Sequence, residues 1–195
     1  KLHKVPVTIT GRVLTMIDLH CHIIPCIDDG SQDMETTKAM LMQAKHGGTT
    51  AIVATPHVID NSQCPDWETI VNRCQELQSV AQEMNIDLPI YPAAEIALSM
   101  DNLDLLPQPG PYCINGGNYA LIELPAFEIP SYALEFFFTL LTRGITPILA
   151  HPERQGEIIK NPDLIVDWVQ RGILVQVNAG SLLGKFGERA RTTAF

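Results

Sequence analysis

Six short apolar runs alternate with helical patterns along almost the whole chain, and this alternation most limits the possible fold. The apolar residues within each run are nearly continuous, which is typical of parallel strands buried on both faces. Strands and helices that alternate in this way predict an α/β fold with a parallel sheet, either open or closed into a barrel. The predicted strands are Thr15–Leu19, Thr49–Ala54, Leu88–Ala93, Tyr119–Leu124, Ile145–Ala150 and Ile173–Val177.

Helix boundaries are recognisable between these strands. Asp33 is placed to cap a helix that runs to about Lys45 and stops at Gly47-Gly48. A longer helix is predicted over about Pro65–Met84, because Pro-Asp-Trp-Glu makes a favourable first turn. The remaining helices are expected over 131–144 and 161–172, with a weaker and shorter one over 98–106.

The chain length limits the number of β/α units. With 195 residues the chain can bury one substantial core, but a complete eight-unit barrel usually needs about 250 residues. Residues 1–14 are basic without a continuous apolar stretch, and we expect them to be an extension or leader before a domain spanning 15–195. No apolar run reaches the roughly 18 residues of a membrane helix, so no membrane insertion is expected.

Charge and cysteine content narrow the class of protein further. The formal net charge is −9 and no basic run is present, which disfavours extended contact with nucleic acid. The five cysteines form no C-x-x-C pair, and their odd number fits thiols in a reducing cytoplasm better than a disulfide scaffold. We therefore expect a cytoplasmic protein.

The first predicted strand carries three polar residues at alternate positions. Asp18, His20 and His22 would share one face of the strand, because successive side chains point to opposite faces. Polar groups lined up on an otherwise apolar strand need partners. Asp28-Asp29-Gly30 follows, which by itself is equally consistent with a turn. A metal ion is the obvious candidate partner for this face.

Histidine, glutamate or asparagine also follows or ends the later strands, in a fold whose active sites lie at the carboxyl ends of the strands. Imidazole and carboxylate ligands without thiolate suit Mn, Fe or Zn in a catalytic site. The set exceeds the needs of one ion, so two or three ions are expected, at a spacing suited to in-line phosphoryl displacement. The residues at these later ends are His57, Glu95, Glu123, His151 and Asn178.

Seven motifs in order resemble the PHP (polymerase and histidinol phosphatase) superfamily. They are "DLHCH", "DDG", "ATPH", "AAEI", "ALIELP", "GITPILAHPER" and "VQVNAGS". More narrowly, the chain resembles the bacterial CpsB/YwqE-like protein-tyrosine phosphatases of capsular and exopolysaccharide biosynthesis. The likeness extends from Met16 to about Arg189.

The resemblance implies a distorted (β/α) barrel of about seven strands around a trinuclear centre that usually contains manganese. His20 and His22 would bind the first ion, and Glu95 would bridge two ions. Asp18 would orient a ligand histidine without binding metal itself.

The rest of the implied site comes from later motifs. Glu123 and His151 would complete the shell of the second ion, while Asp29 and His57 would serve a third. Arg154 would hold the phosphate of the substrate, a role that suits its planar guanidinium. The implied substrate is a phosphotyrosine protein, in particular a bacterial tyrosine kinase of polysaccharide export.

One part of the family pattern is missing. The family ends its metal site with an Asp-x-His on a last strand, whereas no Asp or His follows Asn178 here. We expect a domain that lacks its last C-terminal strand, as in a fragment of a longer protein. A degraded copy is the alternative, and activity without this motif, like the oligomeric state, is left open.

Competing functions differ in the residues they require. A Cys-dependent tyrosine phosphatase needs Arg six residues after its Cys, and none of the five cysteines has one, so that mechanism is excluded. An amidohydrolase would ordinarily use a bridging Lys where this chain has Glu95 and Glu123. Another PHP phosphoesterase, such as a histidinol-phosphate phosphatase, and an inactive metal-binding remnant stay open.

Overall fold

The computed structural model describes residues 8–9, 12–13, 16–60 and 64–195. The chain forms two compact units, each with its own parallel sheet. The first unit comprises Lys1–Pro56 and Pro65–Pro92, and the second comprises His57–Cys64 and Ala93–Phe195. Most of the predicted N-terminal extension lies outside the described residues, apart from a short antiparallel pair, β1 (Thr8–Ile9) and β2 (Arg12–Val13). The domain division predicted from the sequence stays a prediction.

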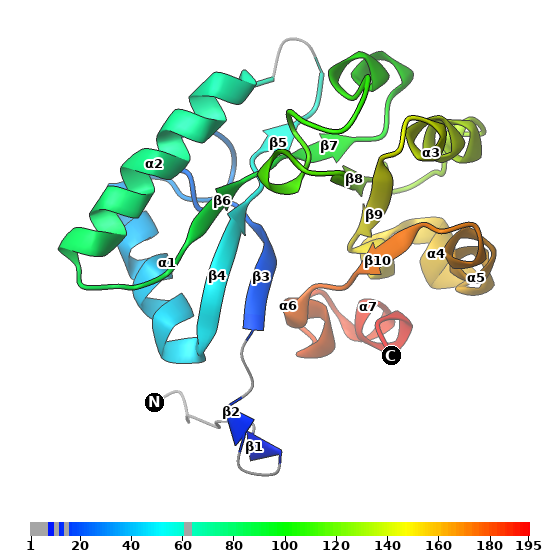
Figure 1. Ribbon diagram of the computed structural model, residues 1–195. Coiled ribbons are helices and arrows are strands. Elements are labelled where there is room, and N and C mark those ends of the chain that lie inside the picture. Colours follow the sequence, from blue (N-terminus) through cyan, green and yellow to red (C-terminus); the bar gives the residue numbers. More distant parts are fainter. Residues whose placement is uncertain (1–7, 10–11, 14–15, 61–63) are drawn as a thin grey trace. The chain divides into compact units, whose positions relative to one another are not determined.

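The first unit contains a three-stranded parallel sheet in the order β3-β4-β6 (Figure 1). The strands are β3 (Met16–Cys21), β4 (Thr49–Ala54) and β6 (Ile90–Pro92). The helices α1 (Met34–Gly47) and α2 (Trp67–Glu83) connect them. The pairing of β3 with β4 is irregular between Asp18 and Cys21, where the polar residues of the strand lie.

The helix boundaries of the first unit follow from their caps. Asp33 caps α1 as predicted, accepting a hydrogen bond from the Thr36 N–H, and Gly48 ends the helix with a left-handed φ of 85°. The helix α2 begins at Trp67, two residues later than predicted. Asp66 sets that start because its carboxylate accepts the Thr69 N–H.

The second unit contains a five-stranded parallel sheet in the order β10-β9-β8-β7-β5. Its strands are β5 (His57–Val58), β7 (Glu95–Ala97), β8 (Tyr119–Glu123), β9 (Thr146–Ala150) and β10 (Leu174–Gln176). Its α-helices are α3 (Ala133–Thr142), α4 (Gly156–Lys160), α5 (Asp163–Gln170), α6 (Ala179–Leu182) and α7 (Glu188–Thr193). Short 3₁₀ turns are η1 (Met100–Leu105), η2 (Ile114–Gly116) and η3 (Pro152–Arg154).

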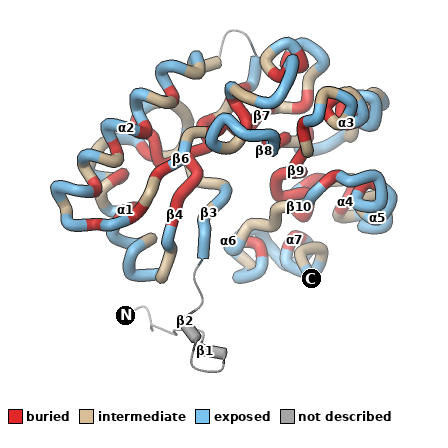
Figure 2. The backbone as a smooth tube through the Cα atoms, in the orientation of Figure 1, coloured by how far each residue is buried: buried red, intermediate tan, exposed pale blue. Residues whose placement is uncertain are grey.

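Burial is strongest on the central strands, as the red segments of Figure 2 show. The expectation of strands buried on both faces is confirmed for the aliphatic residues of β4, β8 and β9, whereas Tyr119 at the start of β8 is exposed. It is wrong for β3, where Ile17 is 57% and Leu19 41% exposed. This strand is an edge of its sheet, since among the described residues it pairs with β4 alone.

The α/β class with parallel sheets is confirmed, but the closed barrel is not found. Within the described ranges neither sheet closes, because β3 and β6 are the edges of one sheet and β5 and β10 are the edges of the other. The predicted strand Leu88–Ala93 also ends early, at Pro92, and the chain starts a separate strand at Glu95. In the described part of the chain, no helix combines the length and the apolar character needed to cross a bilayer.

Candidate functional site

Three titratable side chains of the second unit gather around one buried carboxylate, that of Glu95. Glu95 has no exposed surface, and its Oε1 lies 2.8 Å from His151 Nε2 while its Oε2 lies 3.2 Å from His57 Nδ1. Glu123 lies 3.6 Å from His151 Nε2 and 3.7 Å from His57 Nδ1. We call Glu95, Glu123, His57 and His151 the Glu95 cluster.

Strand register brings this cluster together. His57 and Glu95 follow the ends of β4 and β6 as predicted, and each also begins a short further strand, β5 and β7, in which the two residues are paired neighbours. Glu123 is the last residue of β8 and is paired with Ala97, two residues beyond Glu95. His151 follows β9 directly, so Glu123 and His151 match the predicted position at the carboxyl ends.

The electrostatics of the cluster favour a cation. The pKa of Glu123 is raised above its ordinary value, first by burial and then by the nearby Glu95 carboxylate. The electrostatic effect of the neighbouring His151, His57 and Arg154 opposes that rise. One ligand atom each of His57, Glu95 and Glu123 lies within 4.8 Å of the others, and all are nitrogen or oxygen donors. The donor set therefore fits Mn, Fe or Zn, as expected of imidazole and carboxylate ligands.

The turn after β9 holds His151 and Arg154 in one short segment. His151 adopts a left-handed backbone with a φ of 30°, which is uncommon outside glycine and marks a locally constrained site. The η3 turn follows, and the Arg154 N–H bonds back to the His151 carbonyl at 3.0 Å. Glu123, His151 and Arg154 line a small hollow of about 70 Å³. A cationic side chain therefore borders the Glu95 cluster.

The first unit contains a histidine pair. The Nε2 atoms of His20 and His22 lie 3.1 Å apart, as expected for side chains on one face. His22 Nδ1 lies 2.7 Å from Asp28 Oδ2, which fixes the orientation of this ring. Asp28 Oδ1 also accepts the Gly30 N–H at 2.9 Å, and only glycine fits there, since a Cβ on Gly30 would lie 2.2 Å from His22 Cβ.

Asp18 and Asp29 differ in their surroundings. Asp18 Oδ1 accepts the backbone N–H of His20 at 3.2 Å, and burial raises the pKa of its carboxyl. Asp29 is exposed in the loop, and its carbonyl oxygen lies 3.3 Å from Gln32 Nε2. The roles of both residues in metal binding stay predictions.

Sequence reasoning missed two carboxylates. Asp28 lay within the "DDG" motif but was not assigned a role, although it bonds to His22. Glu153 lies in the "HPER" motif and is 1% exposed, with its Oε1 accepting from Ser181 Oγ at 2.6 Å and from the Asn178 N–H at 3.1 Å. The position of Glu153 directly before Arg154 is the sequence feature that could have indicated its structural role.

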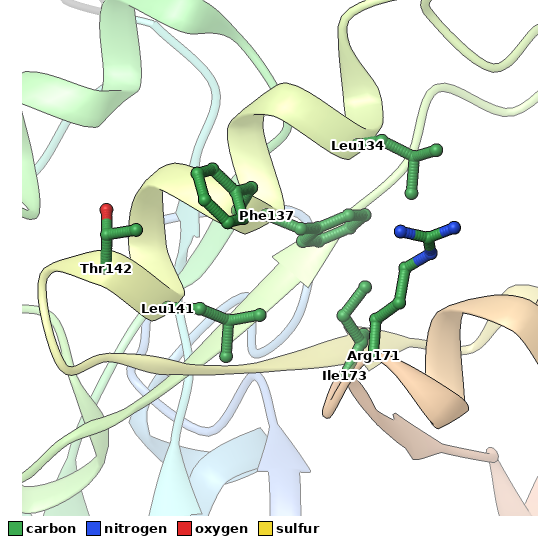
Figure 3. Close-up of a pocket in the computed structure, with 7 residues that line it drawn as sticks. Leu134, Phe137, Leu141, Thr142, Arg171 and Ile173 are labelled. Atoms are coloured by element: carbon green, nitrogen blue, oxygen red, sulfur yellow. The ribbon is translucent and has the colours of Figure 1, made fainter.

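The second unit also contains a larger hollow that none of these groups lines. It has a volume of about 420 Å³ and is mostly apolar, with α3 contributing Leu134 and Phe137 and the segment after α5 contributing Arg171 and Ile173 (Figure 3). It contains no histidine or carboxylate, so it does not share the chemistry of the Glu95 cluster.

Comparisons with known proteins agree with the site residues in pointing to one family. The putative tyrosine-protein phosphatase CapC of Staphylococcus aureus is 36% identical over 176 residues, which cover 90% of this chain and 69% of the relative. The tyrosine-protein phosphatase YwqE of Bacillus subtilis is 34% identical over 176 residues, with the same coverage of both chains. The tyrosine-protein phosphatase CpsB of Streptococcus pneumoniae is 30% identical over 164 residues, which cover 84% of this chain and 68% of the relative.

A solved structure gives the same result. It comes from a study of YwqE from Bacillus subtilis and CpsB from Streptococcus pneumoniae, described there as unique metal-dependent tyrosine phosphatases. It matches with a TM-score of 0.84 at 32% identity and covers 91% of this chain and 72% of that chain. The family model for capsular polysaccharide synthesis proteins CpsB/CapC matches residues 16–194. This chain belongs to the CpsB/CapC family of capsular polysaccharide synthesis proteins.

Proposed function

We propose that this chain is a metal-dependent protein-tyrosine phosphatase. The Glu95 cluster beside Arg154 is the observation that carries the proposal, because it combines metal ligands with a phosphate-binding cation in one unit. The similarity to relatives named tyrosine-protein phosphatases supports the substrate class. The substrate is a phosphotyrosine protein, with a bacterial tyrosine kinase of capsule or exopolysaccharide synthesis as the expected partner, in the cytoplasm.

The metal ligands are the residues predicted from the sequence. His20 and His22 of the first unit offer imidazole nitrogens, and the Glu95 cluster of the second unit offers two carboxylates and two imidazoles. Asp29 is a further oxygen donor. Manganese is the proposed cofactor, in two or three ions, with iron and zinc as the other metals that this donor set suits.

The side chains of this chain bind the phosphate and orient the metal ligands. Bound ions would lower the pKa of a coordinated water and stabilise charge on the phosphate oxygens. Arg154 binds the non-bridging phosphate oxygens through its planar guanidinium. Asp28 holds the ring of His22, and Glu95 orients His151 and His57. No cysteine takes part, because no cysteine has an arginine at the sixth position after it.

The test is phosphate release from a phosphotyrosine peptide by the 195-residue chain with and without Mn²⁺. His151→Asn removes the imidazole, and asparagine tolerates the left-handed backbone at this position better than alanine does. His46→Ala is the matched control, because His46 is an exposed histidine of α1 outside the site. We expect release to require both Mn²⁺ and His151 and to be unchanged in the control.

Three results would contradict the proposal. Release that is unaffected by the metal or by His151→Asn would exclude the Glu95 cluster as the active site. A folded, metal-loaded chain that releases no phosphate would indicate a metal-binding remnant. A higher rate on histidinol phosphate than on the phosphotyrosine peptide would indicate a different PHP phosphoesterase, such as a histidinol-phosphate phosphatase.

A further inference from the structure

Phe186 lies against both Arg154 and Gly180 in the second unit. The Arg154 guanidinium carbon lies 4.5 Å from the centroid of the Phe186 ring, within the range of a cation–π contact. A Cβ on Gly180 would lie 2.9 Å from Phe186 Cε2, closer than real Cβ contacts. Position 180 therefore has to be glycine for the ring to occupy this place.

The segment that seats Phe186 is also tied to the turn that holds Arg154. Glu153 precedes Arg154 in η3 and is buried, and its Oε1 accepts from the Asn178 N–H and from Ser181 Oγ. Asn178 and Ser181 flank Gly180 in the "VNAGS" motif. The Glu153 carboxylate thus ties the segment around Gly180, against which the Phe186 ring lies, to the turn that carries Arg154.

The contact leaves the guanidinium available for a ligand. Arg154 is exposed, and among the described residues its guanidinium forms no hydrogen bond and no ion pair. Its contact with the face of the Phe186 ring is therefore the interaction that orients it. A long exposed arginine would otherwise populate many rotamers, and ordering it costs conformational entropy. The five N–H donors of the guanidinium lie in its plane, so a ring against its face does not occupy them.

We propose that Phe186 is a positioning residue that holds the Arg154 guanidinium for binding of a phosphate monoester, and that Gly180, Ser181 and Glu153 seat it. The inference rests on the proposed role of Arg154 in phosphate binding. Phe186 acts through Arg154, so its loss weakens phosphate binding more than it slows the chemical step. It also gives the "VNAGS" motif a function other than metal binding.

The test compares substitutions that keep or remove the ring face. Phe186→Leu keeps apolar bulk without a ring, whereas Phe186→Tyr keeps the ring. Gly180→Ala displaces the ring without changing either partner of the contact. Phe138→Ala is the control, because Phe138 is 66% exposed on α3 and lines the other hollow. Titration of inorganic phosphate with Mn²⁺ present gives a Kd, and phosphotyrosine peptide hydrolysis gives KM and kcat.

We expect Phe186→Leu and Gly180→Ala to raise both the phosphate Kd and KM about two- to fivefold, with a smaller change in kcat. Phe186→Tyr and Phe138→Ala should match the unsubstituted protein. A Kd unchanged by Phe186→Leu but raised by Arg154→Ala would overturn the inference and leave the proposed function intact. A Kd unchanged by Arg154→Ala would remove the proposed role of Arg154 and the inference with it. If Phe186→Tyr binds phosphate as weakly as Phe186→Leu does, the face of the ring is not what positions Arg154.

Discussion

The His151 imidazole lies 2.8 Å from Oε1 of Glu95, a carboxylate with no exposed surface. Burial of a carboxylate is costly unless it is paired, and here both oxygens face imidazole nitrogens, since His57 Nδ1 lies 3.2 Å from Oε2. Such an arrangement orients the three side chains toward one another. We therefore expect the metal binding proposed for the second unit to depend most on Glu95.

Glu95→Gln keeps the size of this side chain but removes its charge. We expect the apparent affinity for Mn²⁺ to fall by more than the roughly 10- to 100-fold that follows loss of a group supporting a metal ligand. Calorimetric titration of the metal-free chain measures the affinity, and Glu128→Gln, in the loop after β8, is the matched control. Unchanged Mn²⁺ affinity in Glu95→Gln would show that Glu95 is structural.

Asp28→Asn tests whether the Asp28 carboxylate orients the His22 ring in the first unit. Asparagine can still accept the Gly30 N–H, but it lacks the charge that favours a proton on His22 Nδ1 and leaves Nε2 to the metal. We expect phosphatase activity or Mn²⁺ affinity to fall about 10- to 100-fold with the fold retained. Steady-state kinetics over a range of Mn²⁺ concentrations measures this, with Asp87→Asn, in the loop before β6, as the control. Equal effects of both substitutions would contradict the role of Asp28.

The sequence indicated those parts of the fold that are set by local chemistry. Asp33 and Gly48 bound α1 as predicted, because a carboxylate cap and a left-handed glycine act within one helical turn. Glu123 and His151 lie at strand ends as expected, since β8 and β9 are long apolar strands with a clear pattern. These features need no knowledge of distant contacts.

The errors arise where tertiary contacts decide the structure. The strands β5 and β7 have two and three residues, too few to show a periodicity, so the sequence does not reveal that His57 and Glu95, which follow β4 and β6, also begin further strands. Barrel closure depends on pairing between segments far apart in the sequence, which apolar runs cannot reveal. Asp28 and Asp29 are adjacent and chemically identical, and only the folded loop shows which one bonds to His22.

The cap of α2 gives a pH-dependent prediction. Hydrogen bonds from the Thr69 backbone and side chain hold the pKa of Asp66 below its ordinary value. A lowered carboxyl pKa stabilises the fold above the unfolded-state pKa, about 3.9, and this contribution is lost as the pH falls through the folded-state pKa. Asp66→Ala should therefore lower the Tm at neutral pH, with a gap that narrows below pH of about 4. Thermal unfolding at several pH values measures this, and a gap that stays constant with pH would show that the Asp66 charge is not involved.

Alkylation of cysteine should leave the phosphatase activity intact. Burial, with the nearby carboxylates of Asp18 and Asp28, raises the pKa of Cys21 to about 12, and burial raises that of Cys74 to about 12. Both thiols are therefore protonated at neutral pH, and a protonated thiol is a poor nucleophile.

Iodoacetamide at pH 7 is expected to modify the exposed Cys26 without loss of phosphate release, and a Cys-dependent tyrosine phosphatase treated in parallel should be inactivated. Mass spectrometry identifies the modified residues, and Cys26→Ser removes the exposed thiol as a control. If activity is lost in proportion to the alkylation of Cys21, this thiol next to the histidine pair takes part in the reaction. That result would contradict the metal-dependent chemistry proposed for this chain.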